Sequence, residues 1–389
     1  MSQDACSIPA DTPWLAVRRL TLTDFRCYPF LRLDTESRPV VLTGANGAGK
    51  TNLLEALSLL TPGRGLRRAK LSEMARQAAG EGAPWAVAAV LCRPAMGGGV
   101  DETEIGTGRE AGTERRVVRI DGQPARTQSA LAEILSVVWL TPSMDRLFQE
   151  SASGRRRFLD RLVYGLDPAH AGRVNAYEHA LRERARLLKT GGDPQWLAVL
   201  EETMALRGVE IAAARRDWVG RLDQACRAGI GPFPAAGLEL SGMVERWLED
   251  EPGEEVVRRL QAFFATSRRR DSEAGGAADG PHRTDLAVRH RPKDMPAGLC
   301  STGEQKALLV SIVLAQARVQ AELRGAAPLM LLDEVVAHLD ETRRNALFDE
   351  LCALGAQSWL TGTDAALFAG FGSRAQFFRV DDACVTRQQ

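Results

Sequence analysis

The sequence predicts an α/β fold that is interrupted by a mostly helical insertion. The first observation is a glycine-rich stretch at residues 44–51, which lies between an apolar, β-branched run and a helical pattern. The second is an apolar run at residues 328–332 that ends in Asp333 and Glu334. The third is the segment from residue 143 to residue 270, in which apolar residues recur at helical spacing.

The composition limits the classes of protein that the chain can belong to. A chain of 389 residues with 44% hydrophobic content can build about two or three domains with a large core. The 50 basic residues balance the 50 acidic ones, so a nucleic-acid partner would need a local basic patch. The seven cysteines form no Cys-x-x-Cys pair, which argues against a disulfide frame or a zinc site. We expect a cytoplasmic protein, because the sequence has neither a signal-peptide pattern nor a bilayer-spanning apolar run.

The glycine-rich stretch has the pattern of a phosphate-binding loop, or P-loop. Glycines let the backbone curl so that its N–H groups point at a phosphate chain, and the following helix adds the positive end of its dipole. In this pattern Lys50 reaches the β- and γ-phosphates of ATP, and the Thr51 hydroxyl binds Mg²⁺. A glycine-rich turn with a chance Lys-Thr is the alternative, and the strand–helix context argues against it. The predicted ATP-binding residues are Gly44, Ala45, Asn46, Gly47, Ala48, Gly49, Lys50 and Thr51.

The apolar run before Asp333 and Glu334 has the form of a Walker B element. Asp333 is expected to hold Mg²⁺, directly or through water, and Glu334 to orient and deprotonate the attacking water. Apolar strands followed by acidic residues are also common in purely structural settings. The presence of a full P-loop in the same chain favours the catalytic interpretation.

Two further stretches resemble motifs of the ATP-binding-cassette ATPases. Residues 299–306 place Ser301, Gly303 and Glu304 before a helical pattern, as in the signature motif of that class, and Asp340 lies where the class has its D-loop. The resemblance implies that the signature of one subunit closes on the γ-phosphate held by the P-loop of another. The alternative for the signature stretch is a well-capped helix.

Nearly the whole chain resembles the RecF family of bacterial recombination and repair ATPases. A helical insertion between P-loop and signature is typical of the chromosome-structure and repair ATPases, which are SMC-like, and not of transporter heads. The chain departs from the family pattern at Cys27, and it offers Thr361 and Thr363 where cassette ATPases often carry a switch histidine. Its signature reads Cys-Ser-Thr-Gly-Glu in place of a Ser-x-Gly-Gln form. The stretches that carry the resemblance are residues 24–28, 44–57, 154–160, 280–286 and 301–306.

This resemblance implies a function in recombinational repair and in replication maintenance. It implies ATP and Mg²⁺ as cofactors, a homodimer that forms on ATP, and slow ATP hydrolysis that acts as a switch. The expected partners are single- and double-stranded DNA at gaps, bound without sequence specificity, together with RecR and RecO in loading the RecA recombinase. Two other classes stay open. One is the ATPase subunit of a membrane transporter, which would co-purify with a membrane partner, and the other is a nucleotide-binding scaffold without turnover.

The predicted DNA contacts follow the P-loop helix. They are Arg64, Arg67, Arg68 and Lys70, and an ordinary solvated loop is the alternative. A second basic cluster, residues 155–157, is less favoured for DNA, because some of its arginines are expected to pair with carboxylates inside the helical lobe.

The motif order predicts a discontinuous ATPase head and an inserted second lobe. The head is expected to combine residues 1–142 with residues 280–389, and the mostly helical lobe to comprise residues 143–279. A glycine-rich segment at residues 275–280 is expected to be a flexible linker that closes the insertion.

Overall fold

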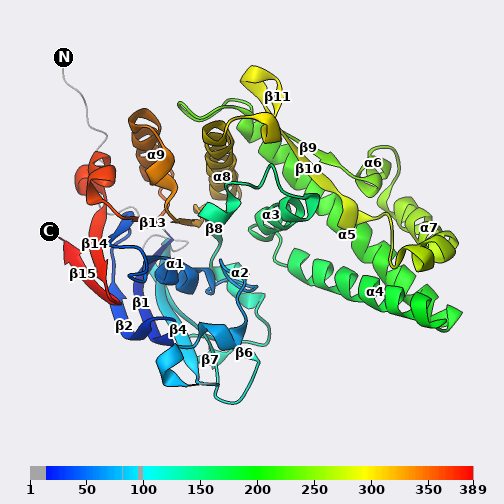
Figure 1. Cartoon of the computed structure of the whole chain (residues 1–389), viewed down its shortest axis with the longest axis horizontal. Helices are drawn as coiled ribbons and strands as arrows, with labels where there is room; N and C mark the ends of the chain where they lie inside the picture. The colour runs from blue at the N-terminus through cyan, green and yellow to red at the C-terminus, as the bar shows by residue number, and fades with distance from the viewer. Residues whose placement is uncertain (1–14, 81, 95–99, 389) are drawn as a thin grey trace. The chain divides into compact units, whose positions relative to one another are not determined.

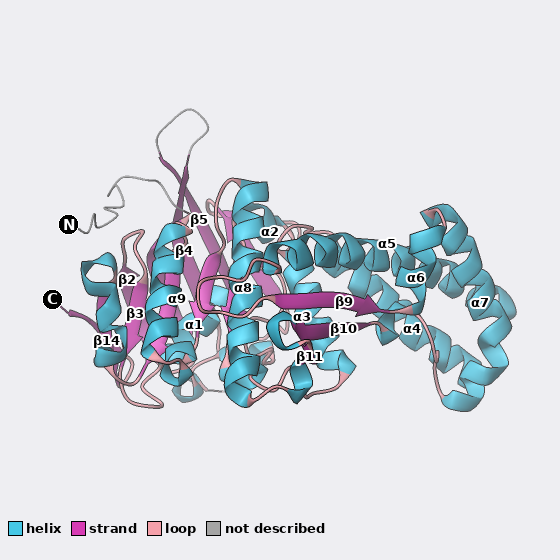
Figure 2. Cartoon of the chain, turned by 90° about the horizontal axis from the view of Figure 1, so that it is seen from above, coloured by secondary structure: helices cyan, strands magenta, loops and turns pink. Residues whose placement is uncertain are grey.

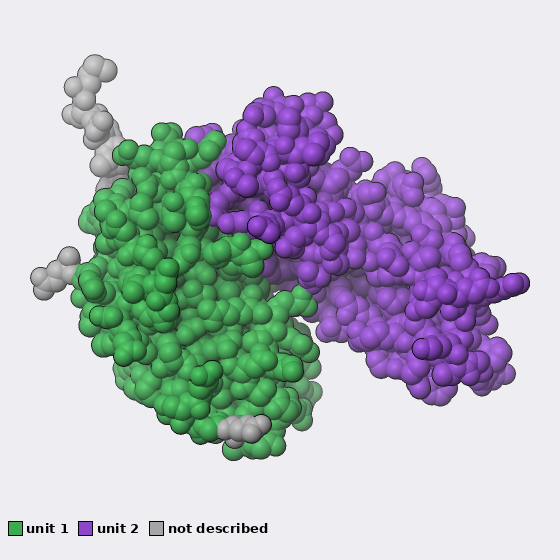
Figure 3. All heavy atoms as spheres, in the orientation of Figure 1, with its two compact units in different colours: residues 1–144, 317–389 green, residues 145–316 purple. Residues whose placement is uncertain are grey.

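The fold is described by a computed structural model, which covers residues 15–80, 82–94 and 100–388. The chain divides into two compact units (Figure 3). Unit 1 combines Met1–Met144 with Ala317–Gln389, and unit 2 consists of Asp145–Gln316. Unit 2 is therefore an insertion into a unit that is built from both ends of the chain. The predicted α/β class is confirmed.

A largely parallel sheet forms one part of unit 1 (Figure 1). Within the described residues it has six strands in the order β15-β14-β3-β13-β12-β8, and its antiparallel pair is β14–β15 at one edge. The central strands β3, β12 and β13 are buried along their whole length, as is usual for parallel strands covered on both faces. The strands are β3 (Val40–Thr43), β8 (Val137–Leu140), β12 (Leu329–Leu332), β13 (Ser358–Gly362), β14 (Gln376–Asp381) and β15 (Cys384–Gln388).

A second sheet of unit 1 is antiparallel. In the described part of the chain its order is β2-β1-β4-β5-β6-β7. Leu20 and Val87 on this sheet belong to the same hydrophobic core as Leu53 and Leu57 on helix α1. The strands are β1 (Ala16–Phe25), β2 (Tyr28–Asp34), β4 (Trp85–Pro94), β5 (Val100–Arg109), β6 (Arg116–Ile120) and β7 (Gln123–Pro124). Unit 1 also holds helices α1 (Lys50–Ser58), α2 (Ala130–Ile134) and α9 (Glu341–Ala353).

The strand order brings distant chain segments to one edge of the parallel sheet. Strand β13 pairs in parallel with β3 on one side and with β12 on the other. Because these strands run in the same direction, the residues at their carboxyl ends lie at the same edge. Those residues are the glycine-rich loop after β3, Asp333 after β12, and Thr361 near the end of β13.

Unit 2 is built mainly from helices, with α4 packed along α5 (Figure 2). Its core is formed by buried side chains of α4, α5 and α7, including Tyr177, Met204 and Phe264. Its strands form a small antiparallel sheet, with the order β11-β10-β9 within the described residues. The elements are α3 (Ala152–Tyr164), α4 (His170–Thr190), α5 (Pro194–Cys226), β9 (Ala236–Ser241), α6 (Met243–Asp250), α7 (Gly253–Ala274), β10 (Asp285–His290) and β11 (Met295–Pro296). Helix α8 (Thr302–Arg324) begins in unit 2 and ends in unit 1.

The division of the chain differs from the expected one at its second boundary. Residues 280–316 were expected in the head, but they belong to unit 2. The reason is strand pairing, since β10 hydrogen-bonds to β9 with Asp285 opposite Ser241. The first boundary lies at Met144, within two residues of the expected position.

The glycine-rich segment at residues 275–280 ends helix α7 and lies wholly inside unit 2. Gly275 has φ 77°, and the N–H of Gly276 donates to the Asp271 carbonyl at 2.8 Å. This is the geometry of a glycine-terminated helix end. The segment is therefore a helix cap and does not connect the two units. None of the helices in the described part of the chain combines the length and the apolar content that a membrane crossing requires.

Candidate nucleotide-binding site

The loop between β3 and α1 requires glycine for steric reasons. Gly44, Gly47 and Gly49 have φ values of 153°, 84° and 114°, in the region that favours glycine. A Cβ at Gly44 would lie 2.1 Å from the Val380 carbonyl oxygen, and one at Gly49 would lie 2.6 Å from the Tyr28 hydroxyl. Any larger residue at these two positions would therefore displace the loop from the strands around it.

Lys50 lies in the first turn of α1 with its ammonium group against the loop. Its Nζ donates to the carbonyls of Gly44 and Ala45 at 2.7 and 2.8 Å. Burial lowers the pKa of Lys50, and the negative charges of Glu334 and Asp333 act in the opposite direction. The ammonium thus hydrogen-bonds to the loop carbonyls, and a phosphate chain in the loop could replace these carbonyls as its partner.

Thr51 and Asp333 lie close enough to share one metal ion. The Thr51 hydroxyl donates to Asp333 Oδ1 at 3.0 Å, although 282 positions separate the two residues. An octahedral Mg²⁺ with ligands at about 2.1 Å places neighbouring ligand oxygens about 3 Å apart. The hydroxyl and the carboxylate therefore fit adjacent positions around Mg²⁺, with the remaining positions left for water and phosphate. Groups of three or more His, Cys, Asp or Glu residues suited to a metal are absent from the described residues.

Thr361 connects both Walker B carboxylate residues. Its hydroxyl donates to Asp333 Oδ1 at 2.7 Å and accepts the backbone N–H of Glu334 at 3.0 Å. Glu334 itself has φ 54°, a strained value for a residue with a side chain. Thr361 therefore positions the predicted metal ligand and the predicted general base together. The sequence marked this residue only as a departure from the usual histidine.

The back of the P-loop is held by aromatic and polar side chains from the segment after β1. The Tyr28 hydroxyl donates to the Gly49 carbonyl at 3.1 Å, and burial raises the pKa of Tyr28. Asn52 Nδ2 donates to Cys27 Sγ at 3.2 Å. Cys27, one of the departures from the family pattern, thus contributes to fixing the start of α1.

Buried Glu55 fixes α1 and the basic loop that follows it. Arg26 donates to both carboxylate oxygens of Glu55, at 2.8 and 2.6 Å. Arg67 donates to Glu55 at 3.1 Å and to Asn52 Oδ1 at 2.7 Å. Sequence reasoning missed the roles of Arg26 and Glu55, and the available signal was the family resemblance of residues 24–28.

Among the predicted DNA contacts, Arg67 thus has an intramolecular carboxylate partner. A phosphate contact would have to compete with that partner or share the guanidinium with it. The other predicted contacts are exposed side chains of the same loop: Arg64, Arg68 and Lys70.

Ser301 and Glu304 form a capping box at the start of α8. The backbone N–H and the hydroxyl of Ser301 donate to Glu304 Oε2 at 3.0 and 2.9 Å, and the Glu304 N–H lies 3.4 Å from Ser301 Oγ. The hydrogen bond from Lys293 and those from Ser301 lower the pKa of Glu304 to about 2. Ser301 and Gly303 are exposed, so they remain accessible for a contact with another molecule.

Asp340 caps the next helix. Its Oδ1 accepts the backbone N–H of Arg343 at 2.8 Å at the start of α9. The position immediately follows the Walker B turn, as a D-loop does, and the contact itself is that of an ordinary helix cap. Its predicted role as a D-loop residue stays a prediction.

Comparisons with known proteins agree with the P-loop architecture. A family model described as the RecF/RecN/SMC N-terminal domain matches residues 16–383. A protein of Rhizobium rhizogenes (strain K84 / ATCC BAA-868) named DNA replication and repair protein RecF is 50% identical over 376 residues, which cover 95% of this chain and 98% of the relative. A protein of the same name from Mesorhizobium japonicum is 50% identical over 383 residues, which cover 97% of this chain and 98% of that relative.

Solved structures show the same fold at lower sequence identity. The recombination mediator protein RecF with ATP, of the RecFOR pathway, superposes with a TM-score of 0.80 at 22% identity, covering 97% of this chain and 100% of that chain. An SMC head bound to the C-terminal winged-helix domain of ScpA superposes with a TM-score of 0.55 at 16% identity, covering 97% of each chain. The prediction of a P-loop ATPase head of the SMC-like type is thereby confirmed.

Proposed function

Because this chain belongs to the RecF family within the RecF/RecN/SMC proteins, we propose that it binds ATP and DNA in recombinational repair and replication. The observation that carries the proposal is the joint arrangement of Lys50, Thr51 and Asp333 at one sheet edge. Relatives that match this chain over nearly their whole length are named DNA replication and repair protein RecF. That agreement favours the repair function over the transporter-subunit alternative.

In this proposal the P-loop holds the phosphate chain of ATP. Loop N–H groups and Lys50 bind the phosphates, and Thr51 and Asp333 bind Mg²⁺, which neutralises phosphate charge when bound. Glu334 orients the attacking water and accepts its proton. Thr361 holds Asp333 and the Glu334 backbone in register for these tasks.

ATP would join two copies of the chain. Ser301 and Gly303 are exposed at the positively polarised start of α8, which suits a contact with the γ-phosphate of a second copy. In the capping box the Glu304 carboxylate accepts the backbone N–H of Ser301. Lys293 also donates to this carboxylate and partly compensates its negative charge. Slow hydrolysis of the bound ATP would then separate the copies and end the DNA-bound state.

DNA would be bound through phosphates, without sequence specificity. Exposed Arg64, Arg68 and Lys70 are the side chains of the basic loop that are suited to this role. The expected partners in loading the RecA recombinase at gaps are RecR and RecO. This part of the proposal comes from the family and from the RecFOR pathway that names the similar structure.

The test is the molar mass of the protein by light scattering, with and without ATP, Mg²⁺ and DNA. We expect a monomer that doubles its mass with ATP and Mg²⁺. Lys50→Ala should stay monomeric because it removes the side-chain cation on the β- and γ-phosphates, whereas Glu334→Gln should remain dimeric after wild type has dissociated. A wild-type molar mass that is the same with and without ATP would contradict the proposed switch. ATP-dependent dimers that hydrolyse no ATP would favour the scaffold alternative.

A further inference from the structure

Two arginine-bearing stretches outside the nucleotide site come together in unit 2. They are residues 154–160 on α3 and residues 280–286, which include the short 3-10 helix η4 (Pro281–Arg283) and the start of β10. Arg155 joins them, because its Nε and one terminal nitrogen each donate to a carboxylate oxygen of Asp285 at 2.7 Å. These two stretches therefore form one cluster, although 130 positions separate Arg155 from Asp285.

The second carboxylate of the cluster is also fully engaged. Asp160 accepts two hydrogen bonds from Arg215 at 2.8 and 2.9 Å and contacts His170 Nε2 at 2.9 Å. Arg215 and His170 hold the pKa of Asp160 below its usual range in spite of burial. Asp160 therefore has little capacity left to neutralise a further cation.

Arg156 and Arg283 are two cations of this cluster that pair with neither of these carboxylates. Arg156 is half-buried and donates to the Thr284 carbonyl at 2.8 Å, and Arg283 is exposed. In residues 15–80, 82–94 and 100–388, no carboxylate oxygen lies within 4.0 Å of either guanidinium. Burial lowers the pKa of Arg156, the positive charges of Arg215 and Arg283 lower it further, and the carboxylates of Asp285 and Asp160 oppose this shift. Within the described residues, Arg156 and Arg283 are thus neighbouring cations that form no ion pair of their own, while Asp285 and Asp160 pair with Arg155 and Arg215.

The backbone that carries Arg283 is fixed from several sides. His282 lies 3.0 Å from the Ala277 carbonyl through Nε2 and 2.8 Å from the Tyr177 hydroxyl through Nδ1. Arg215 also donates to the Pro281 carbonyl at 2.6 Å. The backbone position of Arg283 is therefore set before any ligand arrives, and only its side chain has to be ordered on binding.

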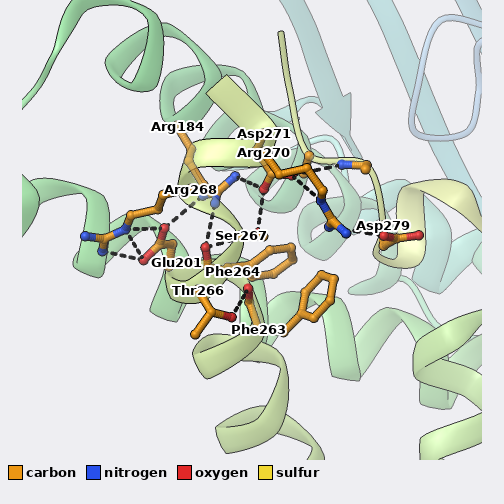
Figure 4. Close-up of polar contacts among 12 residues, drawn as sticks. Arg184, Glu201, Phe263, Phe264, Thr266, Ser267, Arg268, Arg270, Asp271 and Asp279 are labelled. Carbon is orange, nitrogen blue, oxygen red and sulfur yellow. Dashed lines mark hydrogen bonds and ion pairs between the residues drawn. The ribbon is translucent and has the colours of Figure 1, made fainter. Parts of the chain in front are cut away.

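The segment that leads into this turn is held by a buried polar network (Figure 4). Arg184 donates to Glu201 at 2.9 Å and to Asp271 at 2.8 Å, and both carboxylates are almost fully buried. Asp271 in turn accepts the Ala278 N–H at 3.4 Å. Helix α7 and the following turn are thereby fixed to α4 and α5.

We propose that Arg156 and Arg283 form a binding site for backbone phosphates of DNA on unit 2. Guanidinium groups present flat arrays of donors that match phosphate oxygens, and a shared phosphate would relieve the repulsion between the two cations. The site rests on the proposed function, since it assumes that the protein binds DNA. It adds a contact surface that is separate in sequence from the basic loop after α1.

The test is DNA affinity over a salt series in the presence of ATP, measured by anisotropy of a fluorescent duplex. Arg283→Ala should reduce the magnitude of the salt slope by about 0.9, and the double change with Arg156→Ala by about 1.8, because each lost phosphate contact releases fewer counterions. Two duplexes of different sequence should be affected alike. Arg269→Ala is the matched control, because Arg269 is 93% exposed on the same unit and pairs with Glu273.

Light scattering and binding of a fluorescent ATP analogue separate the possible failures. An unchanged salt slope in Arg283→Ala, or an equal change in the Arg269 control, would overturn the site while leaving the proposed function intact. If Arg283→Ala loses ATP binding or dimerisation, Arg283 serves a phosphate of ATP and not of DNA, and this result would likewise overturn the DNA site. A wild-type protein that binds no DNA would contradict the proposed function itself. If Arg156→Ala fails to fold, the exposed Arg283 variant still decides the question.

Discussion

Thr361 is a residue whose importance is seen only in three dimensions. It is fully buried, and its hydroxyl donates a hydrogen bond to Asp333 and accepts one from the backbone N–H of Glu334. Thr361→Val keeps the shape of the side chain and removes the hydroxyl. The Glu334 N–H then loses its partner, which costs about 1–3 kcal/mol if it stays buried.

We therefore expect Thr361→Val to weaken Mg²⁺-dependent ATP binding and to slow hydrolysis, while Thr361→Ser stays close to wild type. Titration of a fluorescent ATP analogue at several Mg²⁺ concentrations measures the first effect. Equal Mg²⁺ dependence in the valine and serine variants would show that Thr361 does not position the metal ligand.

His282 gives the stability of the protein a pH dependence. Burial lowers the pKa of His282 below its ordinary value of 6.5, the Ala277 carbonyl and Asp279 oppose this, and Arg283 and Arg156 reinforce it. The unfolded chain then binds the proton more tightly than the folded one. The contribution of His282 is complete above about pH 6.5, and it is lost as the pH falls through the lowered folded-state pKa.

His282→Gln should remove this dependence, because an amide can still donate to Ala277 and accept from Tyr177 without titrating. The measurement is the free energy of unfolding in urea for wild type and variant from about pH 8 to about pH 5.5. We expect the advantage of wild type to shrink as the pH falls. A difference that stays constant over this range would exclude His282 as the titrating group.

At the scale of elements, buried Arg184 ties helices α4, α5 and α7 together. Its replacement leaves Asp271 and Glu201 buried with fewer partners, although Glu201 keeps Arg268 and Asp271 keeps Ser267. Arg184→Met should lower the free energy of unfolding by about 3–5 kcal/mol.

Arg182→Met on the same helix, which breaks the exposed pair with Glu178, should cost at most about 1 kcal/mol. Urea unfolding followed by circular dichroism compares the two, and similar losses would contradict a structural role for the network.

The sequence predicts elements well where the cause is local. The P-loop and the strand before Asp333 are each defined by neighbouring residues, namely the glycines that need positive φ and the apolar run itself. Partners that lie far apart along the chain could not be predicted in the same way. Arg67 was visible as an exposed cation, but its pairing with Glu55 depends on how the loop folds back onto α1. Likewise, residues 280–316 were placed in the wrong unit because the pairing of β10 with β9 leaves no local signal.

At the scale of the whole molecule, one complete ATP site in the proposed function takes residues from two copies of the chain. Lys50, Thr51 and Asp333 all belong to unit 1, whereas Ser301 and Gly303 belong to unit 2. In the proposed dimer the nucleotide of one copy meets the signature of the other. A C2 dimer built in this way contains equivalent composite sites, and each of them takes residues from both partners.

Mixing two inactive variants tests whether the ATP site is shared between two copies. Lys50→Ala removes the phosphate contact and keeps the signature, and Ser301→Arg blocks the signature and keeps the P-loop. A mixed dimer has one site in which both parts are intact, so the mixture should hydrolyse ATP and form ATP-dependent dimers although neither variant does so alone. Ser301→Arg by itself should bind ATP as a monomer with wild-type affinity. If both variants are folded and their mixture remains as inactive as its components, the ATP site is not shared between two copies.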